Sequence, residues 1–159
     1  MDGFSTDGYI IDQNAFSGYR YREMSSDING CGWIAGYNLL RAAGKDVDFD
    51  TVRRQLDEMI RLRIPGPTPM RTLRRWLGRH LPCRCAAGRK KALEAAGGST
   101  AGILRYWEGR EPHFIAFLRT ADGRYRFLNV ADGLEDIILP MEDFFKAHCS
   151  RGYTRALVI

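Results

Sequence analysis

The segment 31–43, "CGWIAGYNLLRAA", constrains the fold of this chain more than any other stretch. Almost every residue in it is apolar or small, so a helix formed here has no polar stripe to turn toward water. A helix that is apolar on most sides is a buried helix, and Gly44 is well placed to end it. The rest of the chain must therefore supply packing partners around this helix.

Further helices are expected downstream of this segment. Asp50 is a suitable N-cap for a helix over 51–63, in which apolar residues recur at helical spacing and the arginines face outward. The sequence "IPGPTP" ends that helix. Thr68 is then expected to cap a third helix, with Pro69 at its first position. A shorter helix is expected over 89–98.

The last third of the chain has the character of a β-sheet. Short runs rich in aromatic and β-branched residues, typical of strands, occur at 101–107, 113–120, 124–130, 136–139 and 153–159. The turn sequence "ADGR" predicts a hairpin between the second and third runs, and a short helix is expected over 140–148. This order predicts an α+β fold in one domain, residues 1–159. Its helical part would cover about 25–98 and its antiparallel sheet about 100–159.

Length and composition limit the class of protein. A chain of 159 residues with 45% hydrophobic residues can build a substantial core. No run approaches the roughly 18 apolar residues of a membrane span, and the N-terminus lacks the basic and apolar segments of a secretory signal. The four cysteines are unevenly scattered, at Cys31, Cys83, Cys85 and Cys149. We therefore expect reduced thiols in a cytoplasmic protein rather than a disulfide framework.

The net charge of +5 is concentrated in the middle of the chain. Residues 1–50 carry 4 basic and 8 acidic side chains, residues 51–110 carry 14 and 4, and residues 111–159 carry 6 and 7. Much of the excess lies in the basic segment 71–91. Such a segment can attract acidic peptides, nucleic acid or an anionic membrane surface. We favour a solvated, arginine-rich helix face over a dedicated binding site.

Cys31 lies where the buried helix is expected to begin, between Gly30 and Gly32. A nucleophilic cysteine reacts as its thiolate, and the N–H groups and dipole at a helix N-terminus favour that form. The same N–H groups can hold the oxyanion of a tetrahedral intermediate. The flanking glycines would let a substrate backbone approach closely. These features point to nucleophilic chemistry at Cys31.

A cysteine nucleophile needs a base that a third group orients. The chain has three histidines, His80, His113 and His148, and His113 begins an apolar strand that would hold it rigidly. Asn129 follows it by 16 residues, with the expected hairpin turn roughly midway. Pairing of the two strands would bring Asn129 near His113. Its side chain could then accept a hydrogen bond from the imidazole and fix the tautomer.

The order Cys31, His113, Asn129 resembles that of the papain-like cysteine peptidases, with the cysteine on a buried helix and the other two on adjacent strands. The short length and the segment "CGWIAGYNLL" are closest to the small bacterial branch of that family. This branch includes the leader-cleaving peptidase domains of bacteriocin-exporting ABC transporters. The resemblance covers roughly residues 20–159. It implies a helical lobe packed on an antiparallel sheet, with an active-site cleft between them.

By the same resemblance Cys31 is the nucleophile, His113 the base and Asn129 the orienting residue. The family usually has an oxyanion-hole glutamine six residues before the cysteine, where this chain has a serine. Side chains that could take its place are Ser25, Asn29, Gln13 and Asn14. Leader peptidases tend to use aspartate as the third residue, and Asp132 is close to Asn129 in sequence.

The expected activity is hydrolysis of a peptide or amide bond through an acyl-enzyme on Cys31. The same residues would serve an acyltransferase of papain-like fold. A third alternative is an inactive binding module that uses the basic segment 71–91. The expected partner is a peptide or protein substrate, while nucleic acid and a membrane span are not expected.

No cofactor is expected, because the sequence has no Gly-rich phosphate loop and no dinucleotide fingerprint. Zinc donors do occur close together at His80, Cys83 and Cys85, and Cys149 or His148 could add a fourth ligand. The paired CxxC spacing that is typical of structural zinc sites is missing. We therefore expect no metal.

Overall fold

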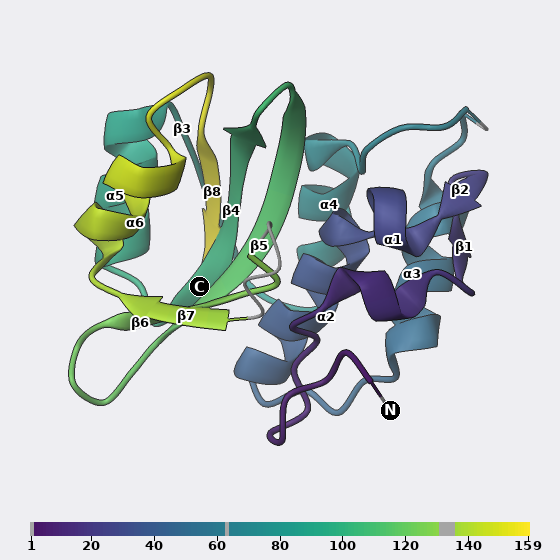
Figure 1. Cartoon of the computed structure of the whole chain (residues 1–159), viewed down its shortest axis with the longest axis horizontal. Helices are drawn as coiled ribbons and strands as arrows, with labels where there is room; N and C mark the ends of the chain where they lie inside the picture. Colours follow the sequence, from purple (N-terminus) through teal and green to yellow (C-terminus); the bar gives the residue numbers. More distant parts are fainter. Residues whose placement is uncertain (1, 63, 131–135) are drawn as a thin grey trace.

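The computed structural model of this chain describes residues 2–62, 64–130 and 136–159. These residues form an α+β fold in which a six-stranded antiparallel sheet lies between two layers of helices (Figure 1). The elements are, in chain order, η1 (Gln13–Phe16), β1 (Arg20–Tyr21), β2 (Met24–Ser25), α1 (Ser26–Asn29), α2 (Cys31–Ala42), α3 (Phe49–Met59), α4 (Met70–Leu77), β3 (Arg84–Ala87), α5 (Arg89–Gly97), β4 (Ala101–Glu108), β5 (Glu111–Arg119), β6 (Tyr125–Leu128), β7 (Asp136–Leu139), α6 (Met141–His148) and β8 (Arg155–Val158).

The sheet has the strand order β3-β8-β4-β5-β6-β7, and its central strands β4 and β5 are largely buried. Successive side chains of a strand point to opposite faces. Accordingly Ile103 and Phe114 join the core formed with α2, α3 and α4, whereas Leu104 and Ile115 join a second core with α5 and α6. The expected helical part, about 25–98, is therefore divided: α2, α3 and α4 pack on one face of the sheet, and α5 packs with α6 on the other.

The expected central helix is confirmed as α2, and its residues from Cys31 to Leu40 are all buried. Its Trp33 packs edge-on against Phe16 of the N-terminal arm, with ring centroids 5.5 Å apart. Gly44 has a φ of +73°, the left-handed conformation that commonly follows a helix end. The apolar segment is thus enclosed by the arm, the neighbouring helices and the sheet.

The caps of the next two helices differ from expectation. Asp48, not Asp50, caps α3, because its carboxylate accepts a hydrogen bond from the main-chain N–H three residues on (2.8 Å). Pro69 is the N-cap of α4 rather than its first residue. The hydroxyl of Thr68 instead shares a 2.8 Å hydrogen bond with the hydroxyl of Tyr21. Thr68 therefore fastens the start of α4 to β1.

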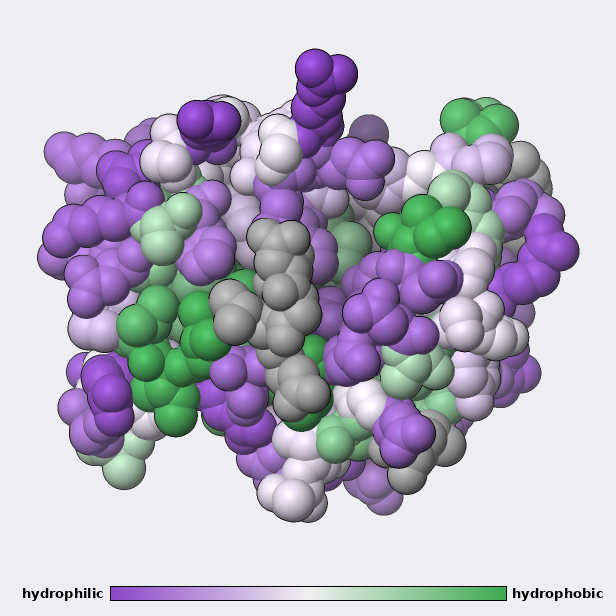
Figure 2. Space-filling view, in the orientation of Figure 1, coloured by the Kyte–Doolittle hydropathy of each residue, from purple (hydrophilic) through white to green (hydrophobic). Residues whose placement is uncertain are grey.

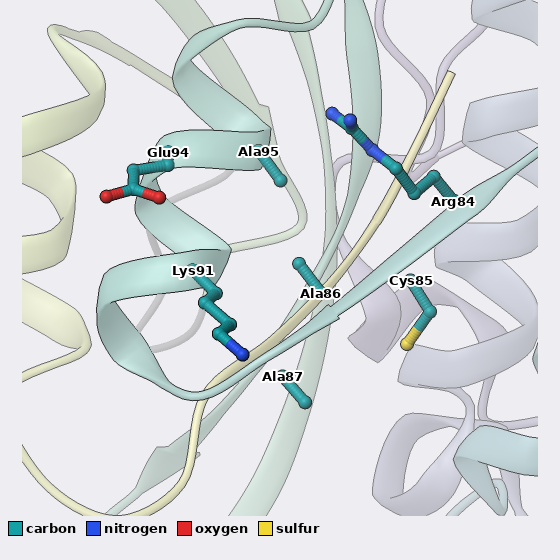
Figure 3. Close-up of a pocket in the computed structure, with 7 residues that line it drawn as sticks. All are labelled: Arg84, Cys85, Ala86, Ala87, Lys91, Glu94 and Ala95. Atoms are coloured by element: carbon teal, nitrogen blue, oxygen red, sulfur yellow. The ribbon is translucent and has the colours of Figure 1, made fainter.

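Strand β3 lies inside the region expected to be helical, and it pairs antiparallel with β8 at one edge of the sheet. Its sequence "RCAA" has neither the alternation nor the β-branched residues that mark a strand. A groove of about 550 Å³ runs between β3 and α5, with Lys91 reaching from the helix toward the strand (Figure 3). The sheet part of the chain therefore begins near residue 84 rather than near residue 100.

The basic segment 71–91 does not form one face. Its α4 portion packs on the α2 side of the sheet and its α5 portion on the opposite side (Figure 1). Figure 2 shows a largely polar surface in this orientation, with an apolar area over β7, where Ile138 is 44% exposed. Within the described part of the chain, no helix has the length and apolar character needed to cross a membrane.

Candidate functional site

Cys31 lies at an interruption between two helical segments. Gly30 separates α1 from α2 and is the N-cap of α2, whose first turn has no side-chain cap. In a continuous helix the N–H of Cys31 would donate to the carbonyl of Asp27. That carbonyl instead accepts a 2.7 Å hydrogen bond from Gln13 Nε2. The thiol itself belongs to a residue that is only 5% exposed.

The glycines beside Cys31 are needed for packing within the protein. A Cβ added to Gly32 would lie 2.1 Å from Thr68 Oγ1, and one added to Gly30 would lie 2.4 Å from the carbonyl oxygen of Ser26. Both distances are far inside van der Waals contact. The space that was expected to admit a substrate backbone is therefore filled by the protein's own atoms.

His113 comes from the first part of β5 and is held by a main-chain carbonyl. Its Nε2 lies 2.9 Å from the carbonyl oxygen of Asn129. A carbonyl oxygen can only accept, so Nε2 must carry the hydrogen. The other ring nitrogen, Nδ1, is then free to exchange a proton with Cys31. This contact fixes the tautomer that a base for Cys31 requires.

The electrostatics of His113 link it to Cys31. Burial by itself would lower the pKa of the imidazole. Hydrogen bonding with Cys31, the charge of its thiolate and the contact with Asn129 outweigh burial, so the pKa of His113 lies above its ordinary value of 6.5. The residue proposed as nucleophile therefore acts electrostatically on the residue proposed as base.

Asn129 is the expected residue, but it acts through a different atom. Strand β6 ends at Leu128, and Asn129 turns out of the ladder with a φ of +60°. Its side chain points to the N-terminal arm: Oδ1 accepts from the N–H of Gln13 (3.0 Å), and Nδ2 donates to Gln13 Oε1 (3.2 Å). The expected hydrogen bond from the imidazole goes to the main chain instead. The alternative third residue, Asp132, lies outside the described residues.

The candidates for a side-chain oxyanion donor are mostly committed elsewhere. Ser25 donates its hydroxyl hydrogen to a main-chain carbonyl at 2.6 Å, and the amide of Asn29 donates to two main-chain carbonyls at 2.9 and 3.3 Å. Asn14 is exposed on η1. Gln13 donates one amide hydrogen to the carbonyl of Asp27 and has a second amide hydrogen that it can donate. Of the four, Gln13 is the half-buried side chain that contacts α1, the segment just before Cys31.

Two arginines within apolar strands were not singled out from the sequence. Arg105 of β4 and Arg155 of β8 are both half-buried and lie directly opposite each other in the sheet. A lone charge inside runs such as "ILRYW" and "TRALV" is the sequence signal that could have revealed them.

The possible zinc donors are dispersed. Cys83 and Cys85 pack near the core on the α2 side of the sheet, whereas Cys149 lies in the core on the α5–α6 side. His148 stacks on a phenylalanine of α6 with ring centroids 4.5 Å apart, and His80 is exposed. Among the residues that the structure describes, no three His, Cys, Asp or Glu side chains are grouped to hold a metal ion.

Comparison of the chain with known protein families finds no matching family model. No curated protein matches it in sequence. The function must therefore be inferred from the chemistry of the site.

Proposed function

We propose that this protein is a thiol hydrolase of papain-like fold that cleaves a peptide or amide bond through Cys31. The observation that carries the proposal is the electrostatic link between Cys31, at the start of the buried helix α2, and His113 of strand β5. A carbonyl fixes the distal nitrogen of the imidazole, which leaves the proximal nitrogen for the thiol. A structural cysteine and a structural histidine have no need of this arrangement.

The mechanism follows from these positions. The Cys31 thiolate attacks the substrate carbonyl, and the N–H groups of the first turn of α2, together with the second amide hydrogen of Gln13, stabilise the oxyanion. His113 gives its Nδ1 proton to the leaving amine, so that the C–N bond breaks and an acyl-enzyme remains. His113 then removes a proton from water, which attacks the thioester and releases the acid. The carbonyl of Asn129 holds the imidazole throughout.

The arrangement of the elements supports a papain-like assignment over an inactive binding module. Cys31 belongs to α2 on one side of the sheet, and its thiolate contributes to the raised pKa of His113 in β5. The alternative module would use the basic segment 71–91, but the sheet divides that segment between two sides of the molecule. Its charges therefore do not make one continuous surface for an acidic partner.

The test is to react the protein with p-nitrophenyl acetate and with iodoacetamide near neutral pH. We expect a burst of one equivalent of nitrophenol and an acetyl group on Cys31 in the mass spectrum, both lost in Cys31→Ser. His113→Gln should slow alkylation of Cys31 at least about tenfold, because it removes the base. His80→Gln, which changes an exposed histidine outside the site, is the matched control.

The proposal fails if Cys31 is alkylated no faster than the half-buried Cys83 and Cys85, or if His113→Gln leaves its rate unchanged. Adding an amine acceptor to the acetylated enzyme distinguishes hydrolysis from acyl transfer. Release of acetate indicates a hydrolase, and formation of an acetamide indicates an acyltransferase.

A further inference from the structure

Two positive charges face each other on the sheet surface that faces α2. Arg105 of β4 and Arg155 of β8 are direct cross-strand partners. Two residues along each strand, Ile103 and Leu157 point into the core beside α2, so both arginine side chains lie on that same face. Like charges directly opposite in an antiparallel pair are destabilising. An anion between them would remove this repulsion.

The side chains found beside these two guanidinium groups are aromatic rings rather than carboxylates. The Arg105 guanidinium lies over the rings of Trp107 and Phe114, at 5.8 and 6.0 Å from their centroids, and that of Arg155 lies 5.2 Å from the ring of Tyr153. No ion pair joins either arginine to a described residue. Ring faces hold a guanidinium without using its N–H donors.

One of these donors is buried without a partner. Arg155 Nε is shielded from solvent and has no hydrogen-bond partner among the described residues. A buried donor left unsatisfied is costly, and a carboxylate can satisfy the guanidinium fork with two parallel hydrogen bonds. The chemistry of the pair therefore fits a carboxylate ligand.

Arg105 lies on the side of the sheet that faces the thiol. Phe114, its cross-strand partner, lies under the Arg105 guanidinium and belongs to the same core as Cys31. Burial lowers the pKa of Arg105, the like charge of Arg155 lowers it further, and the Cys31 thiolate acts in the opposite direction. Arg105 thus interacts electrostatically with both the second arginine and the nucleophile.

We propose that Arg105 and Arg155 bind a carboxylate of the substrate beside the Cys31 thiol. The role as a substrate site rests on the proposed function, whereas the carboxylate site itself does not. The enzyme would then favour chains with a carboxylate next to the bond that it attacks. That carboxylate can belong to an acidic side chain or to a free C-terminus.

The first test compares alkylation of Cys31 by iodoacetate and by iodoacetamide, which differ in charge but react in the same way. Arg105→Gln and Arg155→Gln should each lower the ratio of the iodoacetate rate to the iodoacetamide rate by at least about tenfold, the size expected for a charge-assisted hydrogen bond. Arg119→Gln makes the same charge change at an exposed position at the far end of β5 and should leave the ratio unchanged. An unchanged ratio in the first two variants, or an equal fall in all three, refutes the site.

The second test identifies the source of the carboxylate by protection against iodoacetamide. N-acetyl-aspartate α-amide carries a side-chain carboxylate, N-acetyl-alanine carries a terminal one, and N-acetyl-alanine amide is the neutral control. Protection by the first indicates an acidic residue, and protection by the second indicates a free C-terminus. If Cys31 reacts and neither compound protects it better than the neutral amide, the site is refuted.

A third measurement does not depend on thiol reactivity. In Cys31→Ser protein, titration with N-acetyl-aspartate α-amide or with N-acetyl-alanine should shift the indole N–H resonance of Trp107, and Arg105→Gln should abolish that shift. If Cys31 resists both reagents while the shift is present, the hydrolase is refuted and the carboxylate site stands. If the shift is absent, the carboxylate site is refuted whatever the reactivity of Cys31.

Discussion

Replacing Asn129 with glycine separates the two roles of this residue, because glycine keeps the carbonyl that holds His113 and loses the side chain that holds Gln13. Two hydrogen bonds disappear, of 3.0 and 3.2 Å. At about 1 kcal/mol each, their loss lowers the free energy of unfolding by about 2 kcal/mol. For a chain of this size, that corresponds to a fall in Tm of about 4–8 °C.

Alanine at the same position should be worse than glycine. Asn129 has a φ of +60°, where a Cβ costs about 1–2 kcal/mol. The lower entropy of unfolded alanine returns about 0.4–1 kcal/mol of that. The net expectation is that Asn129→Ala is about 0.5–1 kcal/mol less stable than Asn129→Gly. Urea unfolding followed by circular dichroism measures both differences.

The decisive readout is the His113-dependent alkylation of Cys31 at a temperature where each variant is folded. Asn129→Gly should keep most of it, because the carbonyl acceptor at 2.9 Å remains. Asn38→Ala is the matched control, since it removes an amide that makes two 2.8 Å hydrogen bonds to Ile10. If folded Asn129→Gly reacts as slowly as His113→Gln, the side chain orients the imidazole and our reasoning is wrong.

Three further predictions concern packing and ionisation. Gly32→Ala should lower the free energy of unfolding, measured by urea unfolding, by about 1–3 kcal/mol, because its Cβ would lie 2.1 Å from Thr68 Oγ1. Gly97→Ala is the control: open space surrounds this position, so the change should be neutral or stabilising. The raised pKa of His113 adds stability that is complete below its ordinary value of 6.5 and is lost as the pH rises through the folded-state value. The stability difference between wild type and His113→Gln should therefore shrink as the pH rises above about 6.5, and a constant difference would contradict this. Burial raises the pKa of Cys149 to about 12, so this thiol should resist a disulfide reagent at about pH 8 until urea unfolds the chain, and fast labelling of native Cys149 would disprove it.

The sequence was sufficient where a segment's own pattern decides its structure. The helix beginning at Cys31 and the strand beginning near Ala101 were located because a continuous apolar run can only be buried. The hairpin between β5 and β6 followed from "ADGR". The prediction that His113 serves Cys31 as a base came from the expected positions of the three histidines and from the expected pairing of two strands, and it stays a prediction.

The features that were not predicted depend on tertiary contacts. The sequence of β3 lacks a strand pattern, and the strand forms because its main chain pairs with the free edge of β8. The hydroxyl of Thr68 could have capped α4, but it forms a hydrogen bond with the hydroxyl of Tyr21 instead. The contact of His113 with the main-chain carbonyl of Asn129 could not be predicted either, because every residue type has such a carbonyl.

The hydrogen bonds between Gln13 and Asn129 join parts of the chain that are 116 residues apart. The same glutamine contacts the carbonyl of Asp27, just before the thiol. A ribosome makes Gln13 early and Asn129 late, and contacts over such a separation form slowly in folding. A nascent chain would therefore carry an unassembled, inert thiol through most of its synthesis. The site would become reactive only after the strands that are synthesised last have packed against the N-terminal arm.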